Sequence, residues 1–244
     1  MKKNVLILLT TIIIASCGEK QKKANSVKSD AEAYINKGVA KYNLEDYTGA
    51  IADYNKAIEL NANYDLAYYN RGCAKDELKD YNGAIADYTK AIEINPLDAD
   101  SYSNRGKSYI NLKDYNGAIA DYTKAIEINP LDAEGYYNRG IVKRTLKDFK
   151  GAISDYTNAI ELNPTYADAY NNRGAAKYNL LDYRGAIADC NKAIELNPKY
   201  AEVYYNRGIT KYTLNDKNGG CLDWKKAKEL GNTKAHNLIN MYCK

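Results

Sequence analysis

The sequence contains a single histidine, His236, among 244 residues. A zinc site built on histidines and a serine or cysteine nucleophile activated by histidine both depend on this side chain, so the sequence argues against either. A phosphate-binding P-loop, a metal-ligand cluster and the Gly-x-Ser-x-Gly elbow of hydrolases are also missing. We therefore expect a protein without enzymatic activity, with no catalytic residue, no metal and no cofactor.

Charge of one sign is not in large excess. Lys and Arg number 35 against 31 Asp and Glu, which gives a net charge of +4 with the two signs interspersed. Proteins that bind nucleic acid usually carry a much stronger basic patch, so we expect no nucleic-acid partner. Apolar residues make up 45% of the chain and charged residues 27%, a balance typical of a folded protein.

No hydrophobic run is long enough to cross a bilayer, which takes about 20 apolar residues. The longest run, Val5 to Ala15, follows a positively charged start and fits the core of a signal peptide. The run ends in Ile14-Ala15-Ser16-Cys17, which resembles a bacterial lipobox. The resemblance implies a lipoprotein signal peptide over residues 1–16, cleavage before Cys17 and a lipid on its sulfur; an ordinary secretory signal with an incidental cysteine is the alternative.

The residues after Cys17 are polar, aperiodic and rich in lysine. We interpret residues 17–30 as the lipidated cysteine and a flexible tether. The expected location is the bacterial cell envelope, anchored to a membrane by lipid, and the outer membrane, on its periplasmic or surface face, where the organism has one.

Phenylalanine and tryptophan occur once each, against 25 tyrosines, a bias that indicates copied units. The segment DYNGAIADYTKAIEINPLDA occurs twice, at Asp80 and at Asp114, so the spacing is 34 residues. Alignment on this period gives six repeats: 31–64, 65–98, 99–132, 133–166, 167–200 and 201–234.

Each repeat predicts two helices, at about positions 2–14 and 17–30. Position 4 is always Tyr, positions 8 and 27 are always Gly and Ala, and position 20 is Ala except for Gly220. These small residues let two helices approach closely, and Asn-Pro ends the second helix in four repeats. Leu238, Ile239 and Tyr242 follow at helical spacing, so we expect residues 235–244 to form a helix that caps the array.

This pattern resembles the tetratricopeptide repeat family over residues 31–234. The resemblance implies an all-α fold, a right-handed α-solenoid of six 34-residue helix–turn–helix repeats plus the C-terminal capping helix. It also implies a concave groove lined by the first helices, which binds a protein or an extended peptide. We expect a membrane-anchored monomer that scaffolds envelope complexes; a lipoprotein that binds glycan or peptidoglycan is the alternative.

Position 6, on the expected groove side, is asparagine in every repeat. A carboxamide pairs with both groups of a peptide unit, so a ladder of asparagines suits an extended chain. The alternative is that these side chains bond to a neighbouring helix or to each other across repeats. The candidates are Asn36, Asn70, Asn104, Asn138, Asn172 and Asn206.

Tyrosines at positions 5 and 12 alternate with other residues on the same expected face. Tyrosine offers a large contact area with a polar tip. The candidate groove residues are Tyr69, Tyr137 and Tyr205 at position 5, and Tyr42, Tyr178 and Tyr212 at position 12.

Position 7 is arginine in five repeats and Lys37 in the first, while position 23 is always aspartate. We predict that these residues form structural ion pairs between the two helices of a repeat.

The remaining cysteines fall into two groups. Cys73 and Cys190 are three repeats apart, so we expect small buried residues. Cys221 begins the last repeat's second helix and Cys243 ends the capping helix. Antiparallel packing would bring these two to the same level, and export permits oxidation, so we predict a Cys221–Cys243 disulfide. Two reduced thiols are the alternative.

Overall fold

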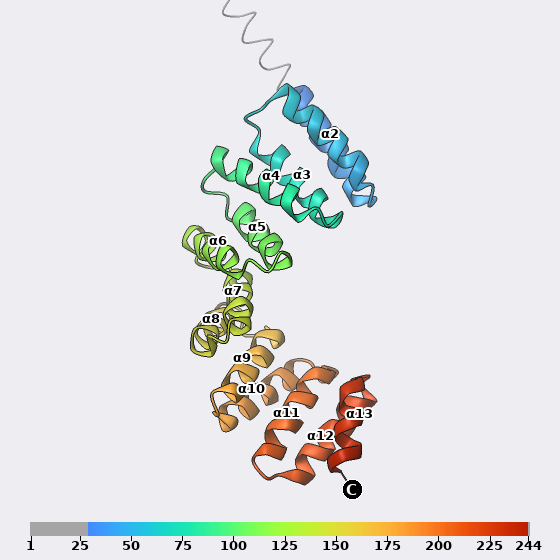
Figure 1. Cartoon of the computed structure of the whole chain (residues 1–244), viewed down its shortest axis with the longest axis vertical. Coiled ribbons are helices and arrows are strands. Elements are labelled where there is room, and N and C mark those ends of the chain that lie inside the picture. Colours follow the sequence, from blue (N-terminus) through green and yellow to red (C-terminus); the bar gives the residue numbers. More distant parts are fainter. Residues whose placement is uncertain (1–28, 244) are drawn as a thin grey trace, which may run out of the picture. The chain divides into compact units, whose positions relative to one another are not determined.

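The computed structural model describes residues 29–243, and every regular element in this range is a helix. The helices follow one another in helix–turn–helix pairs (Figure 1), which confirms the predicted all-α repeat fold. The predicted signal peptide and Cys17 lie outside the described residues. Residues 29 and 30, which the sequence placed in the tether, are already helical.

The described chain divides into two compact units, one ending at Leu112 and the other beginning at Lys113. The division falls in the turn of the third repeat, so the two helices of that repeat belong to different units. The N-terminal unit contains a helix over residues 29–43, then α2 (Tyr47–Leu60), α3 (Asp65–Glu77), α4 (Tyr81–Ile94) and α5 (Ala99–Asn111).

The C-terminal unit contains the remaining helices. Within this unit, α8, α10 and α12 pack on the first helices of their own repeats, and α6, α8 and α10 pack on the first helix of the next repeat. Neighbouring first helices are also in contact, α7 with α9 and α9 with α11. These helices are α6 (Tyr115–Ile128), α7 (Ala133–Thr145), α8 (Phe149–Leu162), α9 (Ala167–Asn179), α10 (Tyr183–Leu196), α11 (Ala201–Thr213), α12 (Lys217–Glu229) and α13 (Thr233–Tyr242).

The turn inside each repeat is built the same way six times. The residue at position 15 takes a left-handed conformation, with φ between 61° and 67°, although none of the six is glycine. The aspartate at position 16 then caps the second helix by accepting a hydrogen bond from the Gly N–H at position 19, as Asp148 does from Gly151 at 2.9 Å. A Cβ at Gly151 would lie 2.1 Å from that carboxylate, so a larger residue there would force the capping carboxylate to shift.

At the core of a repeat, a buried aromatic ring at position 24 packs against the glycine at position 8. Tyr156 is completely buried, and a Cβ built at Gly140 would lie 2.7 Å from its Cε1 atom. Tyr54, Tyr88 and Trp224 meet the glycines of their own repeats in the same way. The glycine therefore makes room for the ring, which packs between the two helices.

We expect Gly140→Ala to lower the free energy of unfolding by about 1–2 kcal/mol. Alanine favours the helix by about 1 kcal/mol, but its methyl group would overlap the Tyr156 ring, and overpacking costs about 1–3 kcal/mol. Gly174→Ala is the matched control, because its nearest side-chain atoms lie 3.4 and 3.6 Å away and only the Ala186 carbonyl oxygen, at 3.1 Å, is close. Urea unfolding should show a change near zero for Gly174→Ala; equal losses at both sites would contradict this account of the core.

Arginine at position 7 and aspartate at position 23 form the predicted ion pairs in the second, fourth, fifth and sixth repeats. In the first repeat the prediction for Lys37 was wrong, because Asp53 pairs with Lys41 at position 11, at 2.7 Å. Arg139 donates from Nε and Nη2 to the two oxygens of Asp155, at 3.0 and 2.7 Å, and Lys143 lies 2.8 Å from the same carboxylate. The Arg139 Nη1 group also donates to Thr123 of the preceding repeat, at 3.1 Å. The same pairs join Arg71 to Asp87, Arg173 to Asp189 and Arg207 to Asp223. The arginine thus links two helices of one repeat to the repeat before it.

The capping helix α13 begins two residues earlier than predicted, at Thr233, because Asn232 accepts a hydrogen bond from the Ala235 N–H at 3.1 Å. It covers Trp224 and Ala227 of α12 with Ala235, Leu238 and Ile239. The Sγ atoms of Cys221 and Cys243 lie 2.03 Å apart, at the distance of a disulfide bond. Cys190 is buried as predicted, while Cys73 is only partly buried.

Candidate functional site

Two cavities open between the first helices of successive repeats, one in each unit. Both are lined at the same repeat positions: 9, 12, 13 and 24 of one repeat, and 6 and 9 of the next. We call them the N-terminal cavity, with a volume of about 480 Å³, and the C-terminal cavity, of about 160 Å³. The N-terminal cavity is lined by Tyr42, Tyr69, Cys73, Asp76, Glu77, Tyr81, Tyr88, Asn104, Lys107 and Asn111.

The N-terminal cavity combines tyrosine rings with two carboxylates. Asp76 accepts hydrogen bonds from the Ser108 hydroxyl, at 2.7 Å, and from the Tyr88 hydroxyl, at 2.8 Å. Burial raises the pKa of the Asp76 carboxyl, while these two hydrogen bonds act in the opposite direction. Tyr42 donates to Glu77 at 3.3 Å, and burial first, then the Glu77 charge, raises the pKa of Tyr42 to about 12. The hydroxyls therefore stay protonated and act as donors around an acidic centre.

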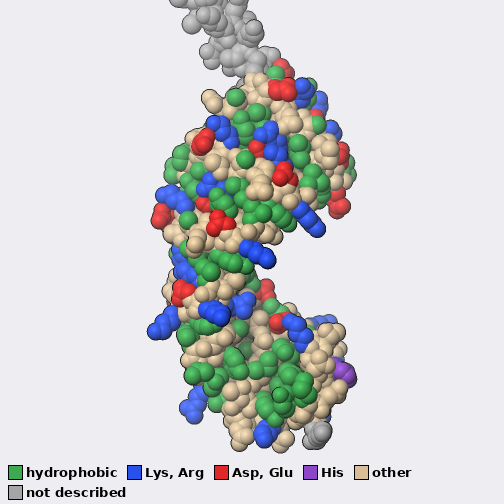
Figure 2. Space-filling model, in the orientation of Figure 1, with side chains coloured by type: hydrophobic (Ala, Val, Ile, Leu, Met, Phe, Trp, Pro, Cys, Tyr) green, Lys and Arg blue, Asp and Glu red, His purple; other side chains and the backbone are tan. Residues whose placement is uncertain are grey.

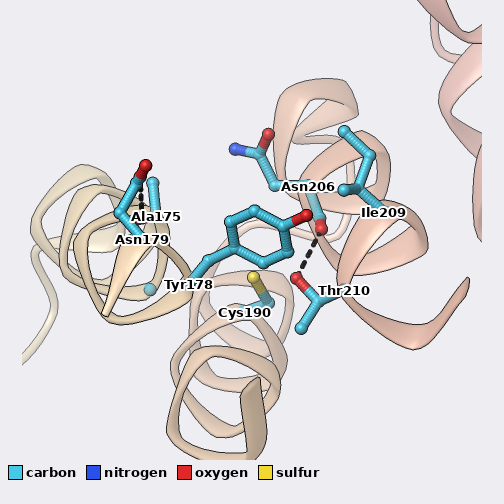
Figure 3. A pocket seen from close by; sticks show the side chains of 8 residues that line it. Ala175, Tyr178, Asn179, Cys190, Asn206, Ile209 and Thr210 are labelled. Carbon is cyan, nitrogen blue, oxygen red and sulfur yellow. Dashed lines mark hydrogen bonds between the residues drawn. The ribbon is translucent and has the colours of Figure 1, made fainter. Parts of the chain in front are cut away.

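The C-terminal cavity is smaller and less charged. Figure 3 shows the Tyr178 ring extending from α9 toward α11, with the Cys190 sulfur below the ring in this view and Thr210 beyond it. Thr210 donates to the Asn206 backbone carbonyl at 2.9 Å. Burial raises the pKa of the Cys190 thiol to about 12, so the sulfur is neutral. The lining consists of Gly174, Ala175, Tyr178, Asn179, Cys190, Asn206, Ile209 and Thr210.

The asparagines at position 6 are partly engaged within the protein. Asn104 donates to the Tyr69 hydroxyl and Asn172 to the Tyr137 hydroxyl, both at 2.9 Å, and Asn206 donates to the Asn171 carboxamide oxygen at 2.9 Å. Each bond joins position 6 of one repeat to position 5 of the repeat before, which is the pairing across repeats that the sequence left as an alternative. The carboxamide oxygen of each asparagine remains as a further acceptor.

The other three asparagines lie elsewhere. Asn138 donates within α7 to Glu134, at 3.5 Å. Asn70 is half-buried and Asn36 is exposed, and none of the three lines either cavity. The structure therefore brings only Asn104 and Asn206 to the cavities, one in each unit.

Three of the six candidate tyrosines line a cavity and three do not. Tyr42 and Tyr69 line the N-terminal cavity, and Tyr178 lines the C-terminal cavity. The other three pack within the C-terminal unit: Tyr137 against Tyr166, with ring centroids 4.7 Å apart; Tyr212 against Trp224, at 5.3 Å; and Tyr205 in the same apolar cluster as Trp224.

Cys73, Asp76, Glu77 and Cys190 also line the cavities but were not among the predicted site residues. A signal was present, because these residues stand at positions 9, 12, 13 and 24, where the repeats differ. Asp76 and Tyr178 occupy the same position 12, and Tyr88 and Cys190 the same position 24. One scaffold thus carries an acidic, tyrosine-rich cavity in one unit and an apolar cavity in the other.

The surface outside the cavities carries both charge signs. Figure 2 shows acidic and basic side chains interspersed over the visible face of the N-terminal unit. Among residues 29–243, no group of histidine, cysteine, aspartate and glutamate side chains is arranged to hold a metal ion. Within the same range, every helix is too short or too polar to span a membrane.

Comparison with known families gives matches to two repeat profiles. The tetratricopeptide repeat profile matches residues 31–64, 66–97, 99–131 and 167–200, more than half of the chain. A related profile, described as a TPR repeat, matches residues 143–180. No curated protein matches this sequence.

Solved structures of similar fold include MamA, at 28% identity over 68% of this chain and 96% of that chain, with a TM-score of 0.63. YrrB, described as a TPR protein with an unusual peptide-binding site, is 24% identical over 77% of this chain and 97% of its own, with a TM-score of 0.67. PilF of Pseudomonas aeruginosa is 16% identical over 88% of this chain and 99% of its own, with a TM-score of 0.75. The latter two likenesses establish the fold alone.

Proposed function

Because the chain belongs to the tetratricopeptide repeat family, whose members are generally non-catalytic scaffolds, we propose that it is a membrane-anchored scaffold that binds a protein through an extended segment. The observation that carries this proposal is the pair of cavities in the same register between neighbouring first helices. In each unit the cavity lies between the first helices of two neighbouring repeats and is lined at equivalent repeat positions, which suits a side chain of a bound segment.

The chemistry of the cavities supports selection of particular side chains. In the N-terminal cavity, Asp76 and Glu77 lie among four tyrosines and outnumber the one lining cation, Lys107, a setting that attracts a basic side chain through charge and through the ring faces. The C-terminal cavity is walled by Tyr178 and Ile209 and suits an apolar one. Asn104 and Asn206 stand at the two cavities with carboxamide oxygens that accept from a peptide N–H.

Capture of the partner in native membranes tests this function. Asn111 and Asn179 are exposed, line the two cavities and stand at the same repeat position, so Asn111→Arg with Asn179→Arg should obstruct both cavities without touching the core. The matched control is Asn82→Arg with Asn116→Arg, at exposed positions of second helices. We expect crosslinking and mass spectrometry to recover one or a few proteins with the wild type and the control and to lose them with the cavity variant. Retention on polysaccharide with no protein partner would instead favour a glycan-binding lipoprotein.

Membrane attachment is the second part of the proposal and depends on Cys17. We expect Cys17→Ala to move the protein from the membrane fraction to the soluble fraction, because two or three acyl chains contribute about 0.8 kcal/mol per buried CH₂ group and nothing else in the predicted mature chain replaces them. Fractionation followed by mass spectrometry of the N-terminal peptide measures both location and lipid. A Cys17→Ala protein that stays in the membrane fraction would contradict the anchor.

A further inference from the structure

Position 24 carries an aromatic ring in every repeat except the fifth. It is tyrosine in the first four repeats, Cys190 in the fifth and Trp224 in the sixth. At Gly140 a Cβ would lie 2.7 Å from the Tyr156 ring, whereas at Gly174 of the fifth repeat the cysteine sulfur is 3.6 Å away. The fifth repeat therefore keeps the glycine that makes room for a ring but has no ring of its own there.

The C-terminal cavity lies where that ring would be. Gly174 and Cys190 both line it, and so does Thr210, which stands at position 10 of the following repeat. In other repeats the ring at position 24 packs against position 10 of the following repeat. Tyr54 packs on Ala74 in this way, and Tyr156 packs on Ala176. The volume of about 160 Å³ is close to that of a cavity of roughly 150 Å³ that binds benzene in another protein.

The walls of the cavity suit an aromatic guest. Tyr178 extends over it from position 12 (Figure 3), and the sixth repeat shows how a ring at position 24 meets such a tyrosine. There Tyr212 and Trp224 pack with ring centroids 5.3 Å apart and planes tilted by 31°. The buried sulfur of Cys190 adds a favourable sulfur–aromatic contact, and Thr210 and Asn206 place polar groups beside the apolar wall of Ile209.

We propose that the C-terminal cavity receives an aromatic side chain of the bound protein, in the space that a position-24 tyrosine fills in other repeats. This inference rests on the proposed scaffold function and gives the partner a chemical requirement. A basic side chain would find no carboxylate in this cavity, because the lining residues are all uncharged. A ring replaces the missing contacts with Gly174, Cys190 and Thr210, and it stacks against Tyr178.

The test uses 4-methylphenol, the tyrosine side chain as a free molecule, with the full-length protein. Binding is followed by the NMR shifts of the Ala175, Ile209 and Thr210 methyl groups. We expect saturable shifts in the wild type and in Cys190→Ala, which keeps the cavity, and a dissociation constant raised roughly tenfold or more in Cys190→Tyr, whose ring would fill it. The first repeat already combines Tyr42 at position 12 with Tyr54 at position 24, so this variant has a precedent in the chain.

Two results would overturn the inference: no shifts in the wild type, or undiminished binding in a folded Cys190→Tyr. If that variant does not fold, crystals of the wild type soaked with 4-bromophenol locate the probe by its anomalous signal, inside or outside the cavity. Partner capture separates this inference from the proposed function. Capture that is equally strong with wild type and Cys190→Tyr would refute the aromatic requirement and leave the scaffold function standing, whereas no capture by the wild type would refute the scaffold function itself.

Discussion

Asp155→Ala is expected to lower the free energy of unfolding by about 3–5 kcal/mol, because it would leave buried cations without a counter-charge. The Asp155 side chain is 2% exposed and faces Arg139 at 2.7 Å and Lys143 at 2.8 Å. Both cations are themselves mostly shielded, with exposed fractions of 15% and 21%. Alanine removes the carboxylate that both cations share. The ion pairs that join α7 to α8 are lost with it.

Urea unfolding followed by circular dichroism measures this loss. Glu195→Ala is the matched control, since Glu195 pairs with Lys192 at 2.7 Å on the surface, with exposed fractions of 68% and 40%. A surface pair of this kind contributes about 0.5 kcal/mol or less. A loss below about 1 kcal/mol for Asp155→Ala, or equal losses for the two variants, would show that the repeated Arg–Asp–Lys group is not what holds the helices of a repeat together.

Replacing Cys221 and Cys243 together by serine is expected to cost about 3 kcal/mol, the entropy of closing the loop between residues 22 apart in sequence. The pair ties α12 to the end of α13, which covers Trp224. Without the link, α13 is held by Ala235 and a few half-buried side chains and would detach before the repeats unfold. The comparison is made on protein exported to an oxidising compartment, with and without reductant.

Reductant should destabilise the wild type and leave the double serine variant unchanged. Cys73→Ser with Cys190→Ala serves as the control, since both cysteines are free and reductant should still destabilise this variant. Alkylation of both Cys221 and Cys243 in exported protein purified without reductant would show that the pair is not oxidised and that the prediction fails.

The repeat fold could be predicted from the sequence because each signal occurs in copies. The contact between glycine at position 8 and the ring at position 24 recurs in several repeats, as between Gly140 and Tyr156. The Arg139–Asp155 pair was predictable for the same reason, since position 7 is basic and position 23 is aspartate in all six repeats. A contact that recurs inside each unit needs no knowledge of how distant parts of the chain meet.

The candidate site was less predictable because it depends on contacts between repeats. The hydrogen bond from Asn172 to Tyr137 joins residues 35 apart and depends on how far one repeat is turned against the next, which a repeat pattern alone does not specify. Cys190 was expected only to be small and buried. The exchange of tyrosine for cysteine leaves a cavity that no larger neighbour closes. This could not be predicted from the sequence, because the cavity is also lined by Tyr178 and by Thr210 of the next repeat.

Photo-crosslinking from one position at a time tests whether the partner binds on the first helices. A photoreactive side chain at Asn179, at the C-terminal cavity, is compared with one at Glu195, exposed on the second helix α10. We expect adducts with one or a few proteins from position 179 and none of these from position 195. Binding on the first helices would be refuted by adducts of equal yield from both positions. It would also be refuted if position 179 gave no adducts while crosslinking of the whole protein captured a partner.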